Sequence, residues 1–225
     1  MQPYMPCNNS FPMMDRSRIH SLLAALCCTL ASFGQGADTT LRVYRSLEEA
    51  LREPERVRSL DLSDQHIRLL PPEISRLINL EELRLRNDDL TALPEEIGSL
   101  SKLRILDLGG NPIQHLPEHF KDLNMLDELY LNEDGYFDLE QDMRTLSLLP
   151  HLRVLHLEND GLTLLPESIS SLQHLEELYL SDNKFKTFPS VVLRMDHLEL
   201  LDLQHNPLDP LIPLELQQRG VLVRF

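Results

Sequence analysis

The sequence predicts an α/β solenoid, a stack of short repeats in which each repeat contributes one strand and one helical turn. Three observations predict it: a phrase Leu-x-x-Leu-x-Leu-x-x-(Asn/Asp) recurs, its spacing stays close to 23 residues, and most copies continue into Leu-Pro-x-x-Ile or a close variant. The copies begin at Val57, Leu80, Leu103, Leu126, Leu152, Leu175 and Leu198. Because a single copy cannot bury its own apolar face, neighbouring copies must stack on one another.

Each copy opens with alternating apolar and polar residues, which is the pattern of a half-buried strand. In the copy that begins at Leu80, Leu83 and Leu85 should point into the core, whereas Glu82 and Arg84 should point outward. The ninth position carries a polar side chain whose oxygen can satisfy backbone N–H groups where the chain turns away from the strand. We interpret these residues as structural: Gln65, Asp88, Asn111, Asp134, Asp160, Asn183 and Asn206.

A proline preceded by an apolar residue follows in most copies, and its fixed φ suits the start of a short helical turn. The pairs are Leu70-Pro71, Leu93-Pro94, Leu116-Pro117, Leu165-Pro166 and Phe188-Pro189. The fourth copy lacks this pair and is three residues longer, since 26 residues separate Leu126 from Leu152. Such an insertion predicts a loop or a longer helix. Its acidic residues do not have the spacing of an EF-hand loop, so we expect no calcium site there.

Composition limits the possible partners and chemistry. The chain has 225 residues, enough for one domain, and 36 acidic against 21 basic residues give a formal charge of −15. This acidity argues against nucleic acid and anionic membrane surfaces as partners, and it either favours a cationic partner or simply keeps the solenoid soluble. The cysteines are confined to Cys7, Cys27 and Cys28, so the repeats can contain no disulfide, cysteine-based zinc site or cysteine nucleophile.

The repeated motif resembles that of the leucine-rich-repeat family, and the resemblance covers about residues 57–216. The 23-residue Leu-Pro variety is similar to repeats of intracellular scaffold, plant-defence and many bacterial members. The resemblance implies a curved horseshoe with parallel strands on the concave face and short helical turns on the convex face. It also implies protein binding, the usual role of the family. The terminal segments of the solenoid lack the cysteines of many extracellular members, which fits a bacterial protein better.

The first residues have the features of an export signal. Arg16 and Arg18 precede an apolar stretch, 22–31, and small residues follow it. Cleavage before Gln35 or before Ala37 would fit, and the first twelve residues are then an upstream extension. The apolar stretch is shorter than the roughly 20 residues that a transmembrane helix needs. We expect no lipid at the cysteines, since no small residue immediately precedes either one, and the alternative is a cytosolic N-terminal helix.

The predicted organisation has four parts. These are an export signal with its possible extension (1–36), a linker with a capping helix (37–56), seven repeats (57–216) and a C-terminal cap (217–225). Ser46-Leu47-Glu48-Glu49 has the form of a capping box that opens a helix ending before Pro54. At the other end the pattern predicts a last helical turn, a break at Gly220 and a final apolar strand.

The outward strand positions from the fourth repeat onward form the candidate binding face. Aromatic side chains within a charged surround are typical of a protein-binding hot spot, although tyrosine and β-branched residues also simply suit strands. The candidate residues are Tyr130, His156, Tyr179, Glu128, Glu158, Glu177, Asp182, Asp202, Val154 and Leu200. We expect a basic protein or peptide to bind there.

We expect neither catalysis nor a cofactor, because the sequence has no phosphate-binding loop, nucleophile elbow or metalloprotease helix. His151, His174 and His197 each precede the first leucine of a repeat and could align, but we interpret them as a solvated ridge rather than a metal site. Two functional classes remain. One is an exported protein-binding module, and the other is a cytosolic scaffold or signalling regulator.

Overall fold

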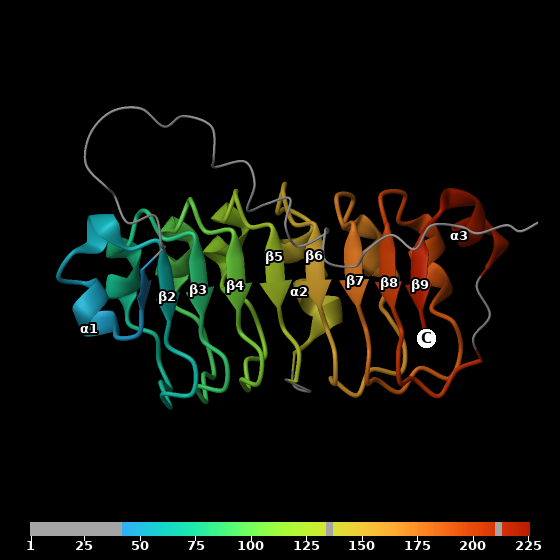
Figure 1. The fold of residues 1–225 in the computed structure, drawn as a ribbon, viewed down its shortest axis with the longest axis horizontal. Coiled ribbons are helices and arrows are strands. Elements are labelled where there is room, and N and C mark those ends of the chain that lie inside the picture. Colours follow the sequence, from blue (N-terminus) through green and yellow to red (C-terminus); the bar gives the residue numbers. More distant parts are fainter. Residues whose placement is uncertain (1–41, 134–136, 210–212) are drawn as a thin grey trace, which may run out of the picture. The chain divides into compact units, whose positions relative to one another are not determined.

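The computed structural model describes residues 42–133, 137–209 and 213–225, which form one stack of repeats (Figure 1). Their strands make a single open sheet in which every neighbouring pair is parallel and the order follows the sequence. The strands are β1 (Val43–Tyr44), β2 (Ser59–Asp61), β3 (Glu82–Arg84), β4 (Ile105–Asp107), β5 (Glu128–Tyr130), β6 (Val154–His156), β7 (Glu177–Tyr179), β8 (Leu200–Asp202) and β9 (Leu222–Arg224). The predicted solenoid is therefore confirmed.

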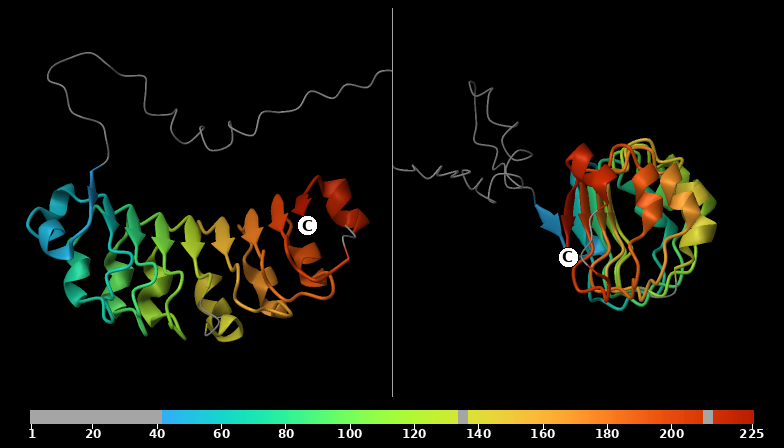
Figure 2. Two further views of the ribbon diagram at one scale, coloured as in Figure 1. Left: turned by 60° about the horizontal axis from the view of Figure 1, so that its bottom comes forward. Right: turned by 90° about the vertical axis from the view of Figure 1, so that its right-hand side faces the viewer.

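Helical segments connect the strands, and in Figure 2 they lie on the outer side of the arc whose hollow side the strands line. Among the described residues, three of them are α-helices: α1 (Leu47–Ala50), α2 (Leu139–Leu146) and α3 (Leu214–Arg219). The others are 3-10 turns: η2 (Pro54–Arg56), η3 (Pro72–Arg76), η4 (Glu95–Ser99), η5 (Glu118–Asp122), η6 (Glu167–Ser171) and η7 (Ser190–Arg194). In the described part of the chain, each turn from η3 to η7 begins directly after a proline. The prolines before η3 to η6 have extended backbones, and Pro189 before η7 has φ −73° and ψ 85°.

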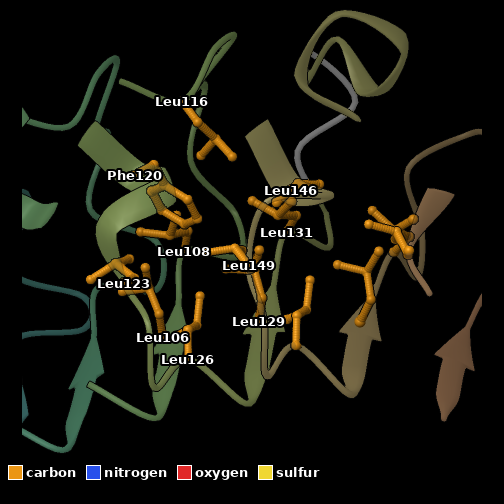
Figure 3. Packing of buried hydrophobic residues seen from close by; sticks show 14 of the residues in the cluster. Leu106, Leu108, Leu116, Phe120, Leu123, Leu126, Leu129, Leu131, Leu146 and Leu149 are labelled. Carbon is orange, nitrogen blue, oxygen red and sulfur yellow. The ribbon is translucent and has the colours of Figure 1, made fainter. Parts of the chain in front are cut away.

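Leucines from successive repeats fill the space between sheet and turns. Leu83 and Leu85 are fully buried, as their alternation predicts, and the equivalent leucines of the other strands are buried with them. Figure 3 shows Phe120 of η5 beside Leu108 and Leu123 within this core. Since each leucine packs on its counterparts in the adjacent repeats, the core is continuous along the stack.

The ninth-position side chains form a buried hydrogen-bond ladder between repeats. Asn111 Oδ1 accepts from the backbone N–H groups of Asp88 and Leu90 at 3.0 Å, and its Nδ2 donates to the carbonyls of Leu85 and Leu108 at 2.7 Å. Asn183 makes the equivalent set of bonds further along the sheet. The structural interpretation of this position is confirmed for these residues, while Asp134 lies outside the described residues.

Both ends of the sheet carry an additional strand. Ser46 caps α1 by accepting from the Glu49 N–H at 3.4 Å, and β1, which the sequence pattern does not indicate, pairs with β2. At the other end Gly220 takes a left-handed φ of 74° after α3, which lets the chain turn into β9. The predicted export signal lies entirely outside the described residues.

The longer fourth repeat forms helix α2 in place of a 3-10 turn. Asp138 caps the helix by accepting from Gln141 N–H at 3.1 Å, and Asp142 on its buried side accepts from the Leu116 N–H at 3.2 Å. His115 also contacts the Asp142 carboxylate, at 3.3 Å. These contacts tie the irregular repeat to the preceding one. No helix among the described residues is long and apolar enough to span a membrane.

Candidate functional site

Strand register brings the three central candidate residues into one line across the sheet. Tyr130 on β5 is paired with His156 on β6, which in turn is paired with Tyr179 on β7. Their side chains point away from the leucine core because each is next to a buried leucine of the same strand. The three rings therefore share the concave face.

These rings form an ordered stack, which we call the aromatic stack. The ring centroids of Tyr130 and His156 are 3.9 Å apart with 8° between the planes, and those of His156 and Tyr179 are 4.4 Å apart with 5° between the planes. The imidazole in the middle is only 9 % exposed, while both tyrosines are half-buried. Neighbouring strands lie about 4.8 Å apart, which is close to the stacking distance of planar rings.

Glutamates on the same strands accept hydrogen bonds from the two tyrosines of the aromatic stack. The Tyr130 hydroxyl donates to Glu128 Oε1 and the Tyr179 hydroxyl donates to Glu177 Oε2, both at 2.6 Å. Each glutamate precedes its tyrosine by two residues, so both side chains lie on one face of the strand. Burial, followed by the hydrogen bond to the glutamate, raises the pKa of each tyrosine well above its usual value, so both hydroxyls stay protonated donors.

His156 is held by a carboxylate at each ring nitrogen. Nδ1 lies 3.0 Å from Glu158 Oε1 and Nε2 lies 3.2 Å from Glu128 Oε1. Burial lowers the pKa of His156, but the hydrogen bonds and charges of the two glutamates outweigh it, so the pKa is raised. Because both nitrogens face acceptors, the geometry fits an imidazolium that donates on both sides.

The remaining predicted residues divide into two groups. Val154 and Leu200 lie half-buried in line with Glu128 and Glu177 on the strands. Asp182 lies in the turn after β7, with a φ of 58°, and pairs there with His205 at 3.0 Å. The structure therefore places Asp182 away from the strand positions that carry the other candidates.

Two basic residues that sequence reasoning did not include compensate part of the acidic charge. Arg224 on β9 is paired with Asp202 in the sheet, and its guanidinium lies 3.4 Å from the nearly buried Asp202 carboxylate. Arg153 binds Asp127 through two nitrogens, at 2.5 and 2.9 Å, and reaches Glu176 at 3.4 Å. The face is thus less negative than a count of its acids indicates. Asp202 and Arg224 are 22 residues apart, so the 23-residue period of the repeats does not indicate Arg224.

The histidine ridge lies at the edge of the same repeats. His151, His174 and His197 are exposed and line a shallow depression with Arg153 and Glu176. Within residues 42–133, 137–209 and 213–225, no group of three or more His, Cys, Asp or Glu side chains is arranged to hold a metal ion.

Comparisons with known proteins agree with this architecture. A family model described as leucine rich repeat matches residues 55–113, 78–135 and 150–208. A leucine-rich-repeat protein of Leptospira interrogans shares 32 % identity and a TM-score of 0.62, over 80 % of this chain and 51 % of that one. A search of curated protein sequences gives no match.

Two receptor structures are similar in fold. Toll of Drosophila, in its complex with Spätzle, shows 21 % identity and a TM-score of 0.60 over 76 % of this chain and 23 % of that one. TLR13 in complex with ssRNA13 shows 25 % identity and a TM-score of 0.60, over 80 % and 25 % respectively. This chain spans about half the length of the Leptospira protein and about a quarter of each receptor chain. The repeated motif, the open parallel sheet and the family match together show that this protein belongs to the leucine-rich-repeat family.

Proposed function

We propose that this protein is an exported, non-catalytic binding module that holds a basic protein or peptide on the concave face of repeats four to seven. The observation that carries this proposal is the aromatic stack, which places Tyr130, His156 and Tyr179 in fixed positions among charged and aliphatic side chains. Aromatic side chains are enriched among the few residues that dominate the energetics of protein interfaces, where a polar rim surrounds them.

Preorganisation supports binding rather than a purely structural role for the face. The hydroxyls of Tyr130 and Tyr179 and both nitrogens of His156 are already engaged, so the rings lose little rotamer freedom when a partner docks. Ordering of side chains is a substantial cost of association, about 0.5–1.5 kcal/mol for each flexible side chain. A rigid platform avoids that cost.

A protein partner fits the family and the charge of the face. Leucine-rich-repeat domains commonly mediate protein–protein binding, and Toll is found in a complex with Spätzle. TLR13 is found with single-stranded RNA, so the fold alone does not choose between partner classes. The formal charge of −15 disfavours a polyanion and favours a basic partner here. Export is proposed from the basic residues and apolar stretch at the N-terminus.

A pair of surface variants can test the binding face. Arginines introduced at the half-exposed Val154 and Leu200 would obstruct the concave face with bulk and positive charge. Leu164→Arg is the matched control, because Leu164 is 72 % exposed and precedes η6, away from the strands. Each protein would be immobilised and incubated with an envelope fraction and with a cytosolic fraction, and the captured proteins would be quantified.

We expect the wild type and Leu164→Arg to capture the same basic protein and Val154→Arg/Leu200→Arg to lose it. Equal capture by all three proteins, each with a cooperative unfolding transition, would exclude the concave face as the binding site. Intact-mass measurement on the protein from each cell fraction tests export. A species that begins at Gln35 or Ala37 supports it, whereas a full-length cytosolic species supports the scaffold alternative.

A further inference from the structure

We propose that the occupant of the concave face is an amphipathic α-helix that lies across the strands, with basic residues seven positions apart and aliphatic residues between them. This inference rests on the proposed function, because it specifies the partner of the same surface. It comes from a feature of the sheet that no single repeat displays, namely the order of side chains along the solenoid axis.

Acidic and aliphatic side chains alternate strictly along one row of the concave face, which we call the alternating row. Cα pairing between adjacent strands places its members side by side: Glu82, Ile105, Glu128, Val154, Glu177 and Leu200, from β3 to β8. Every member is half-buried, so each presents part of its side chain to the concave side. A partner that follows this row meets a carboxylate and an aliphatic group in turn.

The spacing of the row selects the conformation of the partner. Adjacent strands are about 4.8 Å apart, so carboxylates recur about every 9.6 Å with an aliphatic group midway. Seven residues of an α-helix advance about 10.5 Å and return to the same face, and residues three or four positions along that face lie near the midpoint. Over three carboxylates the mismatch is about 2 Å, which the flexible stem of a lysine can absorb.

Other regular conformations fit less well. An extended strand repeats its facing side chains about every 6.7 Å, which matches neither the carboxylate spacing nor the distance to the aliphatic groups. A polyproline II helix repeats every three residues, or about 9.3 Å, which matches the carboxylates. It has no side chain on the same face at the midpoint, so the aliphatic positions would remain without a contact. The alternation therefore favours the α-helix.

The carboxylates of the row are fixed before a partner arrives. Ser59 donates to Glu82 at 2.8 Å, and Arg84 also pairs with Glu82. Glu128 and Glu177 hold the tyrosines of the aromatic stack. An ionised carboxylate offers about four acceptor positions, so these bonds leave it able to accept an ammonium as well.

Glu177 should be the strongest anchor. Glu82 and Glu128 lie within ion-pair distance of Arg84 and His156, whereas the described residues provide no ion pair for Glu177. Its charge is the least compensated in the row, and Tyr179 keeps its orientation. The aromatic stack lies about 7 Å from the row, two residues along each strand, so a helix about 10 Å wide would contact both.

Model peptides can test the spacing directly on the full-length chain. The probe is a fluorescently labelled, alanine-rich helical peptide with lysines seven residues apart and leucines three and four residues after each lysine. The first control peptide has the same composition with lysines five residues apart, which distributes them around the helix. The second carries the same number of lysines at every third position of a polyproline sequence. Affinities would be measured by fluorescence anisotropy at low and physiological salt.

We expect the seven-spaced peptide to bind at least about tenfold more tightly than either control, equivalent to about 1.4 kcal/mol. Glu177→Gln should weaken that binding about fivefold or more, because it removes the least compensated anchor. Glu199→Gln removes the same charge from an exposed residue outside the row, next to Leu200, and should change the affinity less than about twofold.

Equal affinity for the seven-spaced and five-spaced peptides would overturn the inference, since net charge alone would then explain binding. Tighter binding of the polyproline peptide would replace the helix with a polyproline II partner, and indifference to Glu177→Gln would remove the row as the site. Absence of binding by any peptide also overturns the helix inference. The proposed binding face is tested separately, and it fails if Val154→Arg/Leu200→Arg captures the same protein as the wild type.

Discussion

Asp88 occupies a position in the buried ladder that suits an asparagine better. Its Oδ1 accepts from the Gln65 N–H at 2.8 Å, but its Oδ2 is buried without a hydrogen-bond partner. The side chain is completely inaccessible to solvent. At the equivalent place in the next repeat, Asn111 uses its Nδ2 to donate to two carbonyls at 2.7 Å. We therefore predict that Asp88→Asn stabilises the protein.

The size of the gain follows from the missing bonds. A buried polar atom without a partner costs about 1–3 kcal/mol, and each new amide bond contributes about 1 kcal/mol. The introduced amide would become a second donor to the Leu85 carbonyl, which already accepts from Asn111. Such double acceptance occurs elsewhere in the ladder, because the Leu180 carbonyl accepts from both Asn183 and Asn206, at 3.1 and 2.8 Å. We expect Asp88→Asn to raise the free energy of unfolding by about 1–3 kcal/mol at neutral pH, or roughly 2–4 °C in Tm per kcal/mol.

The gain should depend on pH in a defined direction. Burial raises the pKa of Asp88 above its ordinary value of 3.8, despite opposing backbone hydrogen bonds. The folded state then binds more protons than the unfolded state, so the contribution of Asp88 to stability is fully present below the unfolded pKa and is lost as pH rises through the folded pKa. The amide introduced by Asp88→Asn does not titrate, and the advantage of the variant should therefore shrink as the pH falls toward the unfolded value.

Urea denaturation at several pH values, followed by circular dichroism, measures this difference. Asp89→Asn is the matched control, since it removes the same charge from the adjacent exposed residue and should change stability by less than about 0.5 kcal/mol. Asn111→Asp places a carboxylate in the same ladder and should destabilise the protein. Our account of the ladder would be refuted if Asp88→Asn were no more stable than the wild type at neutral pH, or if its advantage did not change with pH.

Three further predictions concern the core, the turns and the aromatic stack. Leu83→Asp should lose more than about 3 kcal/mol, because it removes a fully buried side chain and buries a charge; a near-native urea midpoint would show that the strand register is wrong. Gly98→Ala should lose about 1–3 kcal/mol in the same assay, since a Cβ there would lie 2.2 Å from the His119 carbonyl oxygen; unchanged stability would mean that η4 and η5 can separate. The pKa of His156 is raised, so its contribution to stability should be present below the unfolded pKa and lost as pH rises through the folded pKa. NMR titration of the imidazole and unfolding at several pH values can check this prediction. A folded pKa at or below the usual value for histidine would contradict the pairing of His156 with the two glutamates.

Repetition in the sequence determines most of what could be predicted about the fold. Alternation around Leu83 and Leu85 identifies the buried face, and the repeated phrase sets the register of the strands from β2 to β8. The two-residue strand β1 is too short to show alternation, and it forms because the edge of β2 offers backbone groups to pair with. Helix α2 takes the place of a 3-10 turn in the repeat that is three residues longer, and Asp142 on this helix accepts from the Leu116 N–H.

The candidate site was predictable as a set of neighbours but not as a hydrogen-bonded unit. The spacing of the repeats places Tyr130, His156 and Tyr179 side by side. The orientation of each ring depends on which carboxylate forms a hydrogen bond with its hydroxyl or ring nitrogen, and the spacing does not predict this. Arg224 belongs to a strand that lacks the repeated phrase, so its contact with Asp202 is visible only in the folded chain. Long basic side chains reach across repeats, and charge counted along the sequence therefore overstates the charge of the face.

The same carboxylate serves the aromatic stack and the alternating row, and this links binding to the protonation of His156. Glu128 accepts from His156 and would also accept from a basic partner, so a bound ammonium disfavours the imidazolium beside it. Linkage is reciprocal, so loss of the His156 proton must strengthen the partner's binding by the same factor. The affinity for the seven-spaced peptide should then rise with pH through the folded pKa of His156, while the stability of the free protein falls. Titration of the imidazole with and without peptide measures both: binding must lower the pKa of His156, and an unchanged pKa would mean that the partner does not reach Glu128.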